Sequence, residues 1–168
     1  GPMPFNTIDR VRQSTALKYI NPARNRLNLT LRGDCTVHRI IIDSSSAQRN
    51  KAIGIEVESG GEKFSVYGNE IILSSGAIGS PQLLMLSGIG PQAHLDELGI
   101  PVIHDLPGVG QNLRDHPQVC LVWKVRDDYK HHREGLIRGA TVAIRYTAEG
   151  SDLHNDMLVH HTATAPSK

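Results

Sequence analysis

The sequence predicts a mixed α/β (α+β) fold, and three observations support this. Two segments of alternating apolar and polar residues, 52–58 and 63–67, flank a serine-glycine-glycine turn and indicate a β-hairpin. The segment over residues 70–73 is apolar from Ile71 onward and closes on small residues, which is typical of a buried parallel strand entering a tight turn. Two later stretches carry the proline and glycine signals that begin and end helices.

The remaining elements are predicted from the same signals in chain order. Residues 7–20 are expected to form a short helix ended by Asn21-Pro22, and the apolar pattern from 28 to 43 predicts a strand. Pro81 suits the first turn of a helix to about Ser87, and Pro91 begins a helix through Leu98, capped by Gly99. Further along we expect a strand over 101–104, a turn over 107–117, an ambiguous segment over 131–139, and strands over 119–125, 141–147 and 156–162.

Composition narrows the possible partners. The chain of 168 residues has a net charge of +1 and only 4% aromatic residues, so neither a basic patch nor a stacking platform for nucleic acid is expected. No apolar run approaches the length of a membrane span, so no membrane partner is expected either. Cys35 and Cys120 are far apart in the sequence, which favours reduced thiols and a cytoplasmic protein. We interpret Gly1-Pro2-Met3 as a tag remnant.

The most informative stretch lies between residues 70 and 117. It contains a glycine-alanine pair, a serine-proline pair, two aliphatic residues and a serine-glycine-isoleucine-glycine run, which stand at Gly76-Ala77, Ser80-Pro81, Leu83-Leu84 and Ser87-Gly88-Ile89-Gly90. This spacing closely resembles the second signature of the glucose–methanol–choline oxidoreductases. The resemblance extends from about residue 12 to 126, and includes the Leu-Pro-Gly-Val-Gly and Asp-His-Pro segments that follow.

The resemblance implies an internal fragment of an FAD-dependent oxidoreductase. Residues 4–117 would be the central part of a Rossmann-like FAD/NAD(P)-binding domain, and residues 118–168 the start of a substrate-binding domain. Members of the family oxidise the CH–OH group of a small-molecule alcohol by hydride transfer to the flavin of FAD. Oxidase and dehydrogenase both remain open, as does the identity of the alcohol.

Four residues are candidates for contacts with the cofactor. The resemblance aligns Val37 with a valine whose backbone meets the FAD adenine, although Val37 could equally be an ordinary strand residue. Ser75, Gly76 and Ala77 form a turn of small residues before a helix, which permits close approach of backbone to a dinucleotide and offers free N–H groups to an anion. The alternative is that these small residues only allow the helix to pack on a sheet.

Other expected parts of such an enzyme are missing from these residues. No Gly-x-Gly-x-x-Gly motif occurs, and the resemblance places the catalytic histidine beyond this stretch, so we assign no catalytic residue and expect the isolated chain to be inactive. A non-catalytic nucleotide- or partner-binding module and a remnant of a broken gene are the alternatives. Adjacent histidines at 131–132 and 160–161 would point to opposite faces of a strand, so no metal site is expected. Apolar segments without their usual cover predict self-association.

Overall fold

The computed structural model describes residues 2, 6–9, 11–45, 50–121 and 143–160, and these divide into two compact units. One unit is Thr30–Gln118, and the other combines Gly1–Leu29 with Val119–Lys168. Residues 122–142 lie outside the described residues. They include most of the strand expected over 119–125 and all of the ambiguous segment over 131–139. Residues 119–121, the described part of that expected strand, form no regular element.

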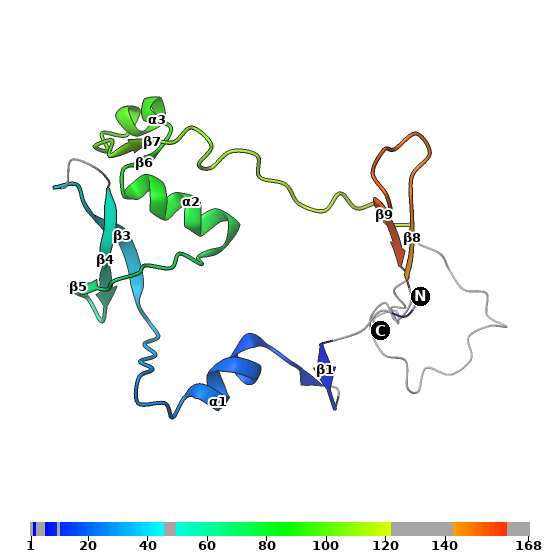
Figure 1. The fold of residues 1–168 in the computed structure, drawn as a ribbon, viewed down its shortest axis with the longest axis horizontal. Helices are drawn as coiled ribbons and strands as arrows, with labels where there is room; N and C mark the ends of the chain where they lie inside the picture. Colours follow the sequence, from blue (N-terminus) through cyan, green and yellow to red (C-terminus); the bar gives the residue numbers. More distant parts are fainter. Residues whose placement is uncertain (1, 3–5, 10, 46–49, 122–142, 161–168) are drawn as a thin grey trace, which may run out of the picture. The chain divides into compact units, whose positions relative to one another are not determined.

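The unit Thr30–Gln118 is built on a three-stranded antiparallel sheet of order β3-β4-β5 (Figure 1). Its strands are β3 (Thr36–Asp43), β4 (Lys51–Ser59) and β5 (Glu62–Tyr67). The hairpin expected over 52–58 and 63–67 is confirmed as β4 and β5, which turn at two glycines with positive φ. The strand expected over 28–43 is confirmed only from Thr36, because the chain turns at Asp34, where φ is +51°.

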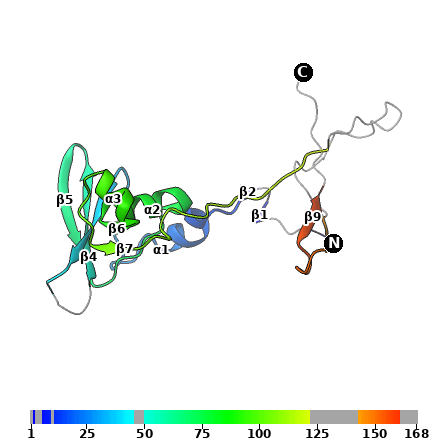
Figure 2. The same ribbon diagram turned by 90° about the horizontal axis from the view of Figure 1, so that it is seen from above.

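Two helices follow the sheet in the chain; Figure 1 shows α2 beside β3, and Figure 2 shows both helices from above. Helix α2 spans Gly76–Leu86, so the expectation that Pro81 lies in its first turn is wrong: Pro81 is the sixth residue of the helix. The N–H that proline lacks would have bonded the carbonyl of Ala77, which is exposed and can be hydrated instead. Helix α3 (Gln92–Glu97) agrees with the expected second helix, and Gly99 follows it with φ +67°.

A small parallel pair lies on either side of α3 in the sequence. Strand β6 (Ile89–Gly90) pairs in parallel with β7 (His104–Asp105), and α3 provides the crossover between them. The carbonyl of Gly88 accepts hydrogen bonds from the N–H groups of Ile103 (2.8 Å) and His104 (3.1 Å). The strand expected over 101–104 is therefore shifted towards the C-terminus, and the turn expected after residue 107 is present. Leu95 of α3 is completely buried.

The parallel strand expected over residues 70–73 is wrong. These residues form no strand in the structure, and the Ile72 side chain is 80% exposed. A parallel strand needs at least one neighbouring strand for its backbone groups, and none of the described strands pairs with this segment.

The second unit contains short elements. Residues 7–20 do not form the expected helix. Strands β1 (Thr7–Ile8) and β2 (Val11–Arg12) pair with each other, and Asp9 between them has φ +49°. A π-helical turn, Ala16–Ile20, then leads into α1 (Asn21–Ala23). Asp tolerates this left-handed conformation, which a continuous helix could not include. The strands expected over 141–147 and 156–162 correspond to β8 (Ala143–Tyr146) and β9 (Met157–His160), which pair antiparallel. Residues 141–142 and 161–162 of these expected strands lie outside the described residues.

Candidate cofactor-binding site

The first candidate residue, Val37, lies on an edge strand beside a β-bulge. Strand β3 pairs only with β4 among the described strands, so its other side is an outer edge. Val37 lies opposite Val57 and Arg39 lies opposite Glu56, which leaves His38 as one extra residue on β3. Such a bulge changes which residues turn their backbone groups to the neighbouring strand.

The register determines where the backbone of Val37 points. The N–H of Gly68 donates to the carbonyl of Ile53 at 3.0 Å, so Ile53 directs its backbone groups to β5. Directions alternate along an antiparallel strand, and Val57, four residues further along, therefore also faces β5. Val57 and Val37 are consequently a pair without mutual hydrogen bonds, and the N–H and C=O of Val37 point to the outer edge of β3.

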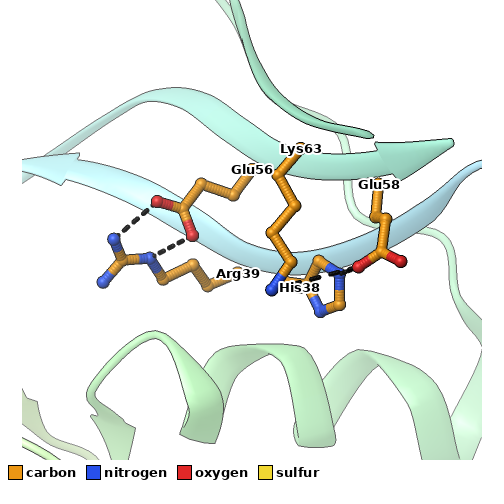
Figure 3. Close-up of polar contacts among 5 residues, drawn as sticks. All are labelled: His38, Arg39, Glu56, Glu58 and Lys63. Carbon is orange, nitrogen blue, oxygen red and sulfur yellow. Dashed lines mark hydrogen bonds and ion pairs between the residues drawn. The ribbon is translucent and has the colours of Figure 1, made fainter. Parts of the chain in front are cut away.

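The side chains around the bulge agree with this register. Adjacent residues of a regular strand point to opposite faces, but His38 and Arg39 lie on the same face (Figure 3). His38 Nε2 is 2.9 Å from Glu58 Oε2, and the Arg39 guanidinium donates to both oxygens of Glu56 at 2.7 and 2.6 Å. Two cross-strand acid–base pairs therefore hold the bulge in place.

The Arg39–Glu56 pair also affects the protonation of its two members. The hydrogen bond from Arg39, followed by its charge, lowers the pKa of Glu56, although burial opposes this. The same hydrogen bond, followed by the charge of Glu56, raises the pKa of Arg39 above its ordinary value. Both side chains are at least a third exposed, so the pair contributes to register more than to overall stability.

The C-terminal end of α2 meets the same outer edge of β3. The N–H of Ile40 donates to Ser87 Oγ at 2.8 Å, and the Ser87 hydroxyl donates in turn to the carbonyl of Leu83, one helical turn earlier. Ser87 is 5% exposed and Ile40 is 8% exposed, so this contact is buried. With the extra residue at the bulge, Ile40 and Val37 turn their backbone groups to the same side.

The other candidate residues form the N-terminal end of α2. Ser75 is the residue before the helix, Gly76 and Ala77 are its first two residues, and all three are exposed. The N–H of Ser75 donates to Ser80 Oγ at 3.0 Å, and no side chain caps the helix. Gly76 has φ +84°, and apart from its own helix and chain neighbours no described residue has an atom within 4 Å of the position that a Cβ would take. The first turn of α2 therefore presents exposed backbone that could receive an anionic group.

The structure places these candidates at two locations. Val37 lies on the outer edge of β3, which contacts the end of α2, whereas Ser75, Gly76 and Ala77 lie at its beginning. The 11 residues of α2 rise about 16 Å between these ends. No hydrogen bond among the described residues joins the two locations, so only an extended ligand could contact both.

Sequence reasoning missed the role of Ser87. It counted this serine only as a position of the signature, and the structure shows its hydroxyl joining α2 to β3. The sequence did contain a signal for this role, since Ser87 directly follows four apolar residues, Leu83 to Leu86. A serine in a helix can stay buried when its hydroxyl donates to the carbonyl four residues earlier, as Ser87 does to Leu83.

Comparisons with known proteins identify the family. Residues 1–118 match the family model described as GMC oxidoreductase. The chain is 48% identical over 155 residues to an oxygen-dependent choline dehydrogenase of Photobacterium profundum, and the aligned region covers 91% of this chain and 26% of the relative. It is 38% identical over 160 residues to the mitochondrial choline dehydrogenase of Homo sapiens, and this aligned region covers 92% of this chain and 26% of the relative. The chain belongs to the GMC oxidoreductase family, whose members are FAD-binding flavoprotein oxidoreductases.

Solved structures agree with this assignment. The fold is similar to pyridoxine 4-oxidase from Mesorbium loti, with a TM-score of 0.54 and 33% identity over 61% of this chain and 19% of that one. It is also similar to a formate oxidase, with a TM-score of 0.52 and 38% identity over 55% of this chain and 16% of that one. These likenesses confirm the expected fold class, a mixed α/β part of a Rossmann-like domain. The chain spans about a quarter of the length of the curated relatives it matches.

Two further features are absent from the described residues. No described helix combines the length and the apolar character needed to cross a membrane. No cluster of three or more His, Cys, Asp or Glu side chains suited to a metal ion occurs in the described part of the chain.

Proposed function

We propose that this chain is part of an FAD-dependent oxidoreductase that oxidises the CH–OH group of a small-molecule alcohol. The match of residues 1–118 to the family carries this proposal. Relatives named choline dehydrogenases make choline the first alcohol to test. FAD, when bound, supplies the acceptor for the hydride that leaves the alcohol carbon.

Within that enzyme the chain would hold the cofactor rather than perform the chemistry. The outward N–H and C=O of Val37 are a donor and an acceptor side by side on an open strand edge. They match the edge of adenine, which offers an acceptor next to a donor. The exposed first turn of α2, at Ser75, Gly76 and Ala77, suits an anionic part of the same cofactor. Both features support binding, and we assign no catalytic group to the described residues.

The domain assignment follows the same proposal. Residues 4–117 would form the central part of the FAD-binding domain and residues 118–168 the start of the substrate-binding domain. The compact unit Thr30–Gln118 contains all four candidate residues and ends close to this boundary, whereas residues 4–29 belong to the other unit.

The experiment is an FAD titration of the full-length apoprotein with two variants at Val37. Val37→Pro removes the N–H, and it should fold because proline is accepted where a strand N–H faces outward. We expect a loss of about 1–3 kcal/mol in FAD binding if the adenine loses its donor. Val37→Ile retains the backbone and should bind FAD like the parent. Equal affinity of both variants would exclude the adenine contact, and absence of FAD-dependent choline or other alcohol oxidation by the parent would exclude the activity.

A further inference from the structure

The buried serine at the end of α2 has a consequence for the nucleotide end of the proposed cofactor site. Ser87 is a polar side chain with 5% exposure, and its hydroxyl both accepts from the Ile40 N–H and donates to the Leu83 carbonyl. The Leu83 carbonyl also accepts from the Ser87 N–H at 3.1 Å, so the hydroxyl is held against its own helix. The helix thus presents an oriented acceptor to one backbone donor of β3.

That donor is the next one on the outer edge after Val37. Because His38 is extra, the bulge turns the backbone groups of Val37 and Ile40 to the same side. Ser87 satisfies the donor of Ile40 and leaves the donor of Val37 without a partner on this edge among the described residues. The edge is therefore divided into one position filled by α2 and one position open to a ligand.

Filling the first position also protects the second. An exposed strand edge with consecutive free donors and acceptors pairs readily with another strand. The end of α2 covers β3 at Ile40, so a strand could not continue past that point to pair with Val37. The same contact fixes the part of β3 that follows the bulge, and with it the direction of the Val37 N–H and C=O.

We propose that Ser87 is a positioning residue for adenine: it holds β3 at Ile40 so that the Val37 backbone can recognise the purine edge. This inference rests on the proposed function. It assigns a role to the serine of the signature that is distinct from packing α2 on the sheet. The role is selective, because a displaced Val37 would lose adenine contacts while phosphate contacts elsewhere remained.

The test compares two purine nucleotides as competitors of FAD on the full-length apoprotein. Adenine offers an acceptor at N1 and a donor at N6, whereas hypoxanthine offers the reverse, so the parent should bind ADP more tightly than IDP. Ser87→Ala should lower the affinity for ADP about 2- to 10-fold, which corresponds to one neutral hydrogen bond, and leave the affinity for IDP nearly unchanged. The ratio of the two dissociation constants is the readout, because a merely loosened structure would weaken both nucleotides equally.

Three further variants make every outcome informative. Ser65→Ala, on an exposed strand position of β5 with no hydrogen bond to a described residue, is the matched control and should keep the parental ratio. Ser87→Cys keeps a weak acceptor, should give an intermediate ratio, and replaces Ser87→Ala if the latter does not fold. Val37→Pro should abolish the preference for ADP. If Val37→Pro retains the preference, the adenine contact itself is wrong. If Val37→Pro loses it while both Ser87 variants keep it, the role of Ser87 alone is overturned.

Discussion

Gly88 of the signature is the position where the structure predicts the largest effect of adding a single methyl group. Its φ is +81°, and a Cβ built there would lie 2.4 Å from the carbonyl oxygen of Pro101 and 3.2 Å from the N of Ile103. Both neighbours are backbone atoms, so no side-chain rotation can relieve the contact. Gly99 is a natural control, because its φ is +67° but no atom lies within 4 Å of its Cβ position.

The two glycines therefore separate backbone strain from steric contact. A left-handed conformation costs a non-glycine residue about 1–2 kcal/mol, which applies to Gly88→Ala and to Gly99→Ala. Crowding against fixed neighbours adds about 1–3 kcal/mol at Gly88 alone. We expect Gly88→Ala to be the more destabilising variant by that amount.

Amide hydrogen exchange of Ile103 and His104 is the suitable assay, because both N–H groups bond the carbonyl of Gly88. A difference of about 1–3 kcal/mol corresponds to exchange about 5- to 150-fold faster in Gly88→Ala than in Gly99→Ala. Similar exchange rates in the two variants would refute the reasoning. It would mean that the loop at Pro101 moves aside without cost and that the close approach at Gly88 is not a constraint.

Three other predictions follow from the sequence and the structure. The isolated 168-residue chain should show no flavin-dependent oxidation of choline or other alcohols in a dye-linked assay, because it contains no Gly-x-Gly-x-x-Gly motif; measurable turnover would contradict this. The isolated chain should also self-associate in light scattering coupled to size exclusion, since Ile72 and Ile78 are 80% and 75% exposed; a monodisperse monomer would be the opposite result. The pKa of Glu56 is lowered in the folded state, so the stabilisation by its ionised carboxylate is present above the ordinary carboxyl pKa and is lost as the pH falls through the lowered value. Glu56→Gln should therefore lower the stability of the folded protein at neutral pH but not in acid. Urea titrations that give the same difference at both pH values would contradict this prediction.

The elements that the sequence predicted correctly are those whose partners are local. The β4–β5 hairpin has its pattern and its turn within 17 residues, and α3 is bounded by Pro91 and Gly99. The run over residues 70–73 carries an equally strong apolar pattern but forms no strand, because a parallel strand depends on neighbours that its own sequence does not specify.

The candidate site residues remain a prediction from the sequence, and their geometry could not be predicted from it. The four candidates came from a turn of small residues and from a resemblance, and both locations are accessible in the structure. The backbones of Val37 and Ile40 share the outer edge because His38 is one extra residue between them, which no periodicity indicates. The link between Ile40 and Ser87 joins residues 47 positions apart, which a pattern read over short windows cannot detect.

The bulge at His38 also has a consequence for natural and engineered variation of this strand. Val37 and Ile40 are three residues apart, an odd separation that would place their backbone groups on opposite sides of a regular strand, and the bulge brings them to the same edge. Deleting His38 would leave them two residues apart, opposite Val57 and Ile55, so ordinary alternation would still direct both amides to the outer edge. Deleting two residues between them would instead turn one of the two amides towards β4. Loss of His38 alone should therefore be tolerated, because it removes the bulge and the contact with Glu58 but keeps the edge that Val37 and Ile40 share.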